Sequence, residues 1–336
     1  MNISHESKTN RWGTNAMRMV STFFSITVIF CTFVFSVVHQ DEKNSSENGN
    51  NNQDKIEIAE LNDEARLQAP GAFVDLPSGK VHYELAGNSE AQTVVLIHGY
   101  SVPYYLWDNT FTPLVEAGFR VLRYDLYGRG YSDRPNVNYD INLYIQQLNS
   151  LLAALDIIQP VDLAGVSMGG SIAVAFTDRH PEKVRKLIFI DTEFTSGVAP
   201  YSPDFLTTGV RQMREQAASM AQGQLGDFYK PEKFSGWPDR YKPQMRFNGF
   251  FRALVSTTMY FYLADYTKMY ERVGKQDRDI LIIWGREDSN IPVEVSKLVQ
   301  KALPKSQLVI VDEAGHLSHY ERPEIVNPVI IDFLKK

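Results

Sequence analysis

Eight short runs of Val, Ile and Leu, separated by amphipathic stretches, most constrain how this chain can fold. Runs that are apolar at nearly every position are typical of strands buried on both faces of a parallel sheet. Strands and helices that alternate along a chain predict such a sheet covered by helices. We therefore predict an α/β protein with a mostly parallel, eight-stranded sheet that opens with a hairpin. The strands are expected at residues 73–76, 80–85, 93–97, 120–124, 161–164, 186–190, 280–284 and 307–311, and helices at 143–155, 169–179, 293–303 and 323–334.

The first 40 residues differ in kind from the rest. Basic residues precede an uncharged apolar stretch at residues 19–38, and acidic residues follow it. As a helix this stretch would span about 30 Å, close to the hydrocarbon thickness of a bilayer. The charge pattern predicts a membrane anchor within residues 1–40, with the folded domain on the outer, extracytoplasmic side. A signal segment that is cleaved, giving a secreted protein, is the alternative. Residues 41–71 follow as a polar linker, flexible at least over residues 41–55.

Composition and motifs exclude several classes of function. The net charge is −6, and no basic run is interleaved with aromatic residues, so nucleic acid is not an expected partner. Cys31 is the only cysteine, which excludes an intramolecular disulfide and a cysteine-based metal site. Neither H-E-x-x-H nor G-x-x-x-x-G-K-[ST] occurs, so we expect no metal and no nucleotide cofactor. The oligomeric state is left open.

The strongest local motif is Gly165-Val166-Ser167-Met168-Gly169-Gly170, which lies between the fifth predicted strand and a predicted helix. A sharp turn from strand to helix exposes a serine hydroxyl to a base. Gly165 and Gly169 are needed there because side chains would collide across the turn. The helix N-terminus also favours developing negative charge. Ser167 is therefore the candidate nucleophile, rather than part of a plain glycine turn.

A second motif, His98-Gly99-Tyr100, follows the third predicted strand. Acyl transfer places negative charge on a carbonyl oxygen, and two backbone N–H groups should bind it. We expect Tyr100 and Met168 to supply these two groups, while Gly99 lets the loop approach the substrate closely. His98 is expected to brace the loop by hydrogen bonding rather than to act as a base.

Asp288 and His316 complete the candidate catalytic set. They follow the seventh and eighth predicted strands, at the sheet edge where open α/β sheets bind their ligands. The order Ser167, Asp288, His316 is that of hydrolases with a nucleophile elbow. His316 would accept the serine proton, and Asp288 would orient the imidazole and stabilise its charged form.

These two roles have rivals nearby in the sequence. Asp191, after the sixth predicted strand, is the alternative acid. Glu287 adjoins Asp288 but is expected to point elsewhere, and His319 is expected on the helix that follows His316. His82 and His180 are interpreted as surface or structural residues.

The motifs, in this order, resemble the α/β-hydrolase superfamily from about residue 72 to the C-terminus. Residues 124–132, YDLYGRGYS, look like the family's loop after strand four, and residues 316–323, HLSHYERP, look like its histidine loop. The resemblance implies the α/β-hydrolase fold, with a core at residues 72–191 and 276–336. The aromatic-rich, mostly helical residues 192–275 would be an insertion, which we expect to act as a cap or lid over the site rather than as an ordinary subdomain.

Within the superfamily, the motifs resemble the branch of monoacylglycerol-type lipases, small esterases, C–C bond hydrolases and cofactor-free haloperoxidases. Ser167 argues against haloalkane dehalogenases and epoxide hydrolases, which use an aspartate there. The resemblance implies a serine hydrolase that acts on small-molecule carboxylic esters or lipids, and the aromatic insertion suggests apolar acyl or aryl groups. Hydrolysis of C–C, amide or thioester bonds by the same triad, or a non-catalytic small-molecule sensor, are the alternatives.

Overall fold

The computed structural model describes residues 56–67, 69–194 and 199–336. The predicted membrane segment at residues 19–38 and the predicted tether at residues 41–55 lie outside the described residues, and both stay predictions. Within the described ranges, no helix is long and apolar enough to cross a bilayer.

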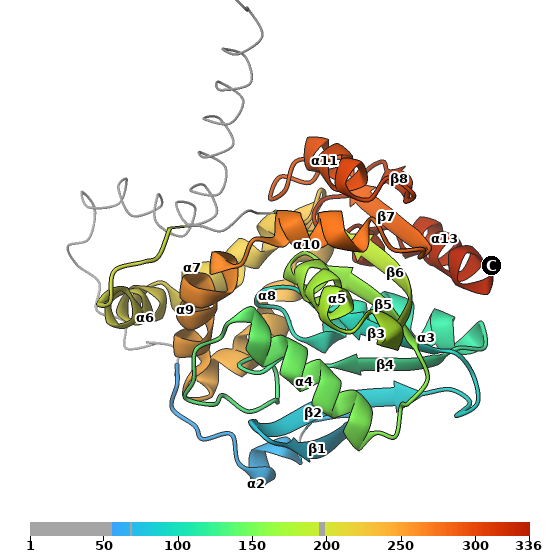
Figure 1. The fold of residues 1–336 in the computed structure, drawn as a ribbon. Helices are drawn as coiled ribbons and strands as arrows, with labels where there is room; N and C mark the ends of the chain where they lie inside the picture. The colour runs from blue at the N-terminus through green and yellow to red at the C-terminus, as the bar shows by residue number, and fades with distance from the viewer. Residues whose placement is uncertain (1–55, 68, 195–198) are drawn as a thin grey trace, which may run out of the picture. The chain divides into compact units, whose positions relative to one another are not determined.

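Eight strands form a single sheet in the order β1-β2-β4-β3-β5-β6-β7-β8 (Figure 1). β2 pairs antiparallel with β1 and β4, and all other neighbours are parallel. The predicted fold class is therefore confirmed, and each strand lies where its apolar run predicts it. The strands are β1 (Ala72–Leu76), β2 (Gly79–Ala86), β3 (Thr93–Ile97), β4 (Arg120–Tyr124), β5 (Val161–Val166), β6 (Val184–Ile190), β7 (Ile280–Gly285) and β8 (Gln307–Val311).

Helices cover both faces of the sheet. In β3, Val95 and Ile97 pack into one hydrophobic cluster, whereas Val94 and Leu96 pack into another on the opposite face. Successive side chains of a strand point to opposite faces, so an all-apolar strand needs both faces covered. The first face carries α4 (Ile141–Ala154), α5 (Met168–Arg179), α10 (Tyr266–Val273) and α11 (Glu294–Ala302), and the second carries α3 (Asp108–Glu116) and α13 (Pro323–Lys335).

The described part of the insertion, residues 192–194 and 199–275, is mostly helical. Its large aromatic residues Phe228, Trp237, Phe250 and Phe251 are buried among one another and against the second face. Most of its aromatic character therefore builds its own core. Besides α10, which packs on α5, the elements are α6 (Phe205–Glu215), α7 (Ala217–Gly223), α8 (Trp237–Tyr241) and α9 (Phe250–Tyr260), with short 3₁₀ turns η4 (Gln224–Asp227), η5 (Pro231–Phe234), η6 (Lys242–Arg246) and η7 (Phe261–Leu263).

Residues 56–67, here called the N-terminal strap, join the insertion to the sheet. The N–H groups of Glu57 and Ala59 donate to the carbonyls of Met245 and Arg246, both at 3.0 Å. The Glu57 carboxylate pairs with Arg214 of α6. Further along, α2 (Asp63–Arg66) ends in Arg66, which is buried and pairs with Asp133 beside the sheet. The last residues of the predicted linker thus hold defined contacts.

Candidate active site

Ser167 occupies the turn between β5 and α5. Its φ of 53° and ψ of −124° lie outside the regions that L-residues favour. The turn is held on both sides, because the Ser167 N–H donates to Ile190 at 3.0 Å and the Ser167 carbonyl accepts from Gly170 at 2.9 Å. This strained strand-to-helix turn is the geometry expected of a nucleophile elbow.

The two glycines of the motif are required by close backbone contacts. A Cβ atom on Gly165 would lie 2.3 Å from the carbonyl oxygen of Gly169. A Cβ atom on Gly169 would lie 2.3 Å from the carbonyl oxygen of Ile97, at the end of β3. Neither oxygen belongs to a flexible side chain, so the elbow has room only for glycine at both positions.

The loop after β3 passes beside Ser167. A Cβ atom on Gly99 would lie 3.8 Å from Ser167 Oγ. His98 is buried, and its Nε2 accepts from the Leu126 N–H while its Nδ1 donates to the Gly99 carbonyl, both at 2.9 Å. Burial lowers the pKa of His98 to about 4, so its imidazole is neutral. His98 thus hydrogen-bonds both to its own loop and to the loop after β4, and its role at the site stays a prediction.

The structure also places the two residues predicted to bind the oxyanion. Met168 is the first residue of α5, where a helical N–H has no partner within the helix. The Tyr100 carbonyl accepts from Arg129 Nε at 2.7 Å, and the Tyr100 hydroxyl donates to Leu254 of α9 at 2.9 Å. Tyr100 therefore ties this loop to the insertion. The oxyanion role of both residues stays a prediction.

Asp288 and His316 form a hydrogen-bonded pair past the ends of β7 and β8. His316 Nδ1 donates to Asp288 Oδ2 at 2.9 Å, which leaves Nε2 to accept a proton. The other Asp288 oxygen accepts the N–H groups of Asn290 and Ile291, at 2.8 and 2.9 Å. Burial opposes the charged form of His316, but the charge and hydrogen bond of Asp288 outweigh it and raise the pKa of His316.

Asp191 makes different contacts from those of Asp288. Its carboxylate accepts from the Gly285 N–H at 2.6 Å and from Ser318 Oγ at 2.7 Å. It therefore joins the loop before Asp288 to the loop after His316, without a hydrogen bond to the imidazole. Burial, together with the nearby Asp288 charge, raises the pKa of Asp191.

The remaining rivals are engaged elsewhere. His319 lies on α12 (Ser318–Glu321), as predicted, and donates from Nε2 to the Leu106 carbonyl at 3.2 Å. Burial lowers the pKa of His319 to about 3. Glu287 accepts from the Ala314 N–H at 3.0 Å. Both side chains support loops of the site.

Within the described ranges, Ser167 Oγ and His316 are not joined by a hydrogen bond. Catalytic hydrogen bonds of this kind are often long without substrate and tighten when it binds. In the same part of the chain, no group of three or more His, Cys, Asp or Glu side chains could hold a metal ion.

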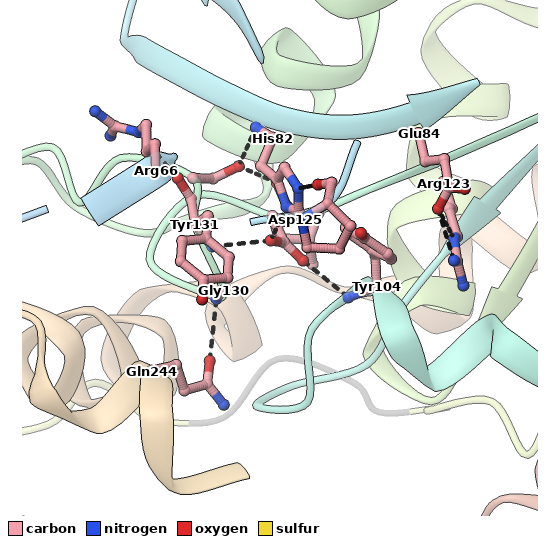
Figure 2. A network of polar contacts seen from close by, with 12 residues as sticks. Arg66, His82, Glu84, Tyr104, Arg123, Asp125, Gly130, Tyr131 and Gln244 are labelled. Atoms are coloured by element: carbon pink, nitrogen blue, oxygen red, sulfur yellow. Dashed lines mark hydrogen bonds and ion pairs between the residues drawn. The ribbon is translucent and has the colours of Figure 1, made fainter. Parts of the chain in front are cut away.

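A buried hydrogen-bond network that includes Asp125, Gly130 and Tyr131 of residues 124–132 was not predicted from the sequence. Figure 2 shows it from close by. Asp125 accepts from His82 Nδ1 at 2.7 Å and from the Tyr104 and Tyr131 N–H groups at 2.8 and 2.9 Å. His82 Nε2 faces the Pro70 carbonyl at 2.5 Å. Both ring nitrogens thus meet acceptors, which favours the imidazolium. Burial lowers the pKa of His82, but Asp125 outweighs burial and raises it.

The same network connects the core to the insertion. The Gly130 N–H donates to Gln244 Oε1 at 3.0 Å (Figure 2). Gln244 Nε2 donates to the Ser101 carbonyl at 3.0 Å. One side chain of η6 thereby bridges the loops that follow β3 and β4. No sequence pattern predicts this contact of Gln244, because the residue lies in η6, which is a single short turn.

Residues 92–323 match the family described as "alpha/beta hydrolase fold". The chain is 27% identical to the AB hydrolase superfamily protein YfhM of Bacillus subtilis (strain 168), over 78% of this chain and 97% of that protein. It is 30% identical to the 2-hydroxy-6-oxononadienedioate/2-hydroxy-6-oxononatrienedioate hydrolase of Paraburkholderia xenovorans (strain LB400), over 78% of this chain and 94% of that protein. Among solved structures, the enol-lactonase from Burkholderia xenovorans LB400 shares the fold, with a TM-score of 0.67 and 22% identity over 79% of this chain and 100% of that chain.

Proposed function

The chain belongs to the α/β-hydrolase family of enzymes, and on this premise we propose that it is a serine hydrolase that cleaves carboxylic esters through an acyl-enzyme. The observation that carries the proposal is the strained turn at Ser167, with Gly99 beside it. The hydrogen bond between His316 and Asp288 adds a base that is already oriented. This combination is what an activated serine requires.

In the proposed mechanism, Ser167 Oγ attacks the ester carbonyl while His316 Nε2 accepts its proton. Asp288 stabilises the imidazolium, and the N–H groups of Tyr100 and Met168 bind the oxyanion. The imidazolium then protonates the departing alcohol. A water molecule, activated by His316, attacks the acyl-enzyme, which releases the carboxylic acid and restores Ser167.

We propose that the acyl or aryl group of the substrate is apolar and uncharged. A substrate carboxylate would need a cation in the site. Arg129, a buried cation beside Tyr100, already donates to Tyr144, Thr257 and the carbonyls of Tyr100 and Tyr127. Its guanidinium is therefore committed to holding the loop. The hydrogen bond from the Tyr100 hydroxyl to the Leu254 carbonyl of α9 supports the proposal that the insertion acts as the cap of the site.

Hydrolysis of a C–C bond is the second candidate. The relative from Paraburkholderia xenovorans is named a hydrolase of a 6-oxo-dienedioate, and 30% identity over most of both chains brings that reaction into consideration. The same serine, histidine and aspartate would serve it. Its dicarboxylate substrate would, however, require cations that Arg129 does not supply.

The test is a fluorophosphonate probe on the full-length chain, comparing wild type with Ser167→Ala. We expect labelling of wild type and no labelling of the variant. A series of p-nitrophenyl esters should show turnover with a preference among acyl chains, and the variant should lose on the order of 10⁴-fold in rate. Labelling without ester turnover, together with cleavage of a 2-hydroxy-6-oxo-dienoate, would instead favour C–C bond hydrolysis. A wild type that does not label overturns the proposal and favours the sensor.

We also propose that residues 19–38 anchor the enzyme in a membrane with its folded domain outside. The support is the uncharged apolar stretch with basic residues before it and acidic residues after it. Carbonate extraction of membranes tests this proposal. A membrane anchor should keep the full-length chain in the pellet. Recovery of a shortened chain in the medium would show cleavage and secretion instead.

A further inference from the structure

One residue of the insertion touches both loops of the Asp288–His316 pair. Asp227 is the last residue of η4, and its backbone carbonyl accepts the His316 N–H at 2.8 Å. Its side-chain Oδ1 accepts from Asn290 Nδ2 at 2.5 Å. Asn290 in turn donates its backbone N–H to Asp288 at 2.8 Å. Asp227 is thus bonded to the backbone of the proposed base and to the loop of the proposed acid.

Neighbouring contacts hold residues 227–229 of the insertion against the loop that carries His316. The Glu321 carboxylate accepts the Gly315 N–H at 2.7 Å and the Tyr229 N–H at 2.9 Å. A Cβ atom on Gly315 would lie 2.7 Å from the Asp227 carbonyl oxygen. The insertion and the histidine loop are therefore in direct backbone contact, with no room for a side chain between them.

Titratable groups from four parts of the fold face His316, and three of them are carboxylates. Asp288 follows β7, Asp191 follows β6 and Asp227 ends η4, and all three add negative charge that favours the imidazolium. His319, on α12, also faces His316. Asp227 is the one carboxylate of this set that the insertion contributes, and burial raises its own pKa.

We propose that Asp227 is a positioning residue for His316, so that the insertion completes the Asp288–His316 pair as well as covering it. The inference rests on the proposed serine-hydrolase function. The Asp227 carbonyl fixes the histidine loop, and its carboxylate fixes the loop of Asp288. Its charge stabilises the imidazolium that forms when Ser167 attacks.

The experiment compares two substitutions of Asp227 in the full-length chain. Asp227→Asn keeps an acceptor for Asn290 and removes the charge, whereas Asp227→Ala removes both. Glu232→Gln is the matched control, because Glu232 is an exposed acid on η5 of the same insertion. Two quantities are measured: the pKa of His316, by NMR of ¹⁵N-histidine-labelled protein, and kcat and KM for a p-nitrophenyl ester across pH.

We expect Asp227→Asn to lower the pKa of His316 by about one unit, as loss of a nearby negative charge should. The acid limb of the kcat/KM profile should shift to lower pH by a similar amount. Glu232→Gln should leave the pKa of His316 and the pH profile unchanged. Asp227→Ala should lower kcat by roughly tenfold more than Asp227→Asn, with KM within about twofold of wild type. The reason is that the side-chain hydrogen bond from Asn290 to residue 227 is lost.

An unchanged His316 pKa in Asp227→Asn, with the wild-type pH profile, overturns the inference. If Asp227→Ala does not fold, the titration of Asp227→Asn still decides. The NMR titration needs no substrate, so it separates two failures. A wild-type protein that shows neither labelling nor turnover contradicts the proposed function. An unchanged pKa of His316 in Asp227→Asn contradicts only the role of Asp227.

Discussion

Ser167 holds a backbone conformation that its two flanking glycines make possible. Gly169→Ala should push a Cβ atom into the carbonyl oxygen of Ile97, which would lie 2.3 Å away. We expect a loss of about 1–3 kcal/mol in the free energy of unfolding and a loss of fluorophosphonate labelling. Urea denaturation and labelling rates measure both.

The control for this substitution is Gly223→Ala, at the end of α7, where a Cβ atom would meet nothing within 4 Å. It should leave labelling unchanged and cost nothing in stability, since alanine favours helices over glycine. Wild-type stability and labelling in Gly169→Ala would contradict the elbow geometry.

In the proposed mechanism, the pH dependence of catalysis is set at His316. Its pKa lies above the ordinary value of 6.5, so near neutral pH much of the imidazole is protonated and cannot accept the serine proton. We expect kcat/KM to rise with pH, with its half-maximal point above 6.5. In Asp288→Asn this point should fall and the plateau should drop by about 10⁴-fold. A wild-type acid limb at or below pH 6.5 would refute the expected environment of His316.

Residues that carry motifs could be predicted, and residues that only support them could not. Asp288 and His316 follow parallel strands, whose ends meet at one edge of the sheet, so their pairing could be inferred from strand order. Asp227 lies in a short turn of the insertion with no periodic pattern. Its contact with His316 depends on how the whole insertion packs. The partnership of His82 with Asp125 likewise links residues 43 positions apart.

Among the elements, the N-terminal strap offers the clearest test. The Glu57 side chain is nearly buried, and it pairs with Arg214 of α6 and accepts the Phe251 N–H of α9 at 3.2 Å. Glu57→Ala should release α6, at a cost of about 1 kcal/mol in overall stability. Hydrogen exchange should quicken in Phe205–Glu215 while the sheet stays protected.

Asp63→Asn is the matched control for the strap, because its side chain is 88% exposed and its nearest cation is 3.6 Å away. It should leave exchange in α6 unchanged. Equal exchange in wild type and Glu57→Ala would mean that α6 is held by its packing on α9 and α7, without a contribution from Glu57.

The elements differ in how well the sequence predicted them. All eight strands and the helices α4, α5, α11 and α13 were predicted, since their apolar spacing is long and regular. α3 was missed because Pro113 lies inside it, and proline argues against a helix interior. In the insertion, only a general helical character could be read. Its helices are short, and their burial depends on distant partners.

For the molecule as a whole, the buried His82–Asp125 pair links stability to pH. A raised histidine pKa contributes stability that is full below the unfolded value of 6.5 and is lost as pH rises through the folded pKa. The lowered pKa of Asp125 affects stability at the acidic end of the pH range. Burial alone would raise it, but His82 outweighs burial, so this contribution is present above 3.8 and is lost as pH falls through the folded pKa.

His82→Gln should therefore cost most near pH 6, on the order of 3–5 kcal/mol, because it leaves Asp125 buried without its cation. The difference from wild type should shrink as pH rises above 6.5. Urea denaturation at pH 6, 7, 8 and 9 measures it. His180→Gln, at a partly exposed histidine, should stay within about 0.5 kcal/mol of wild type. A pH-independent difference for His82→Gln would argue against an ion pair.

The strap also decides where mechanical load enters the molecule. Residues 57–59 hydrogen-bond to residues 245 and 246 of the insertion before the chain reaches its first strand at Ala72. Tension applied upstream of Ile56 is therefore borne first by these backbone bonds and by the Glu57–Arg214 pair. Only after they part, and after Arg66 leaves Asp133, does the load reach β1. A pull on the N-terminal side would thus strain the helices of the insertion long before it strained the sheet.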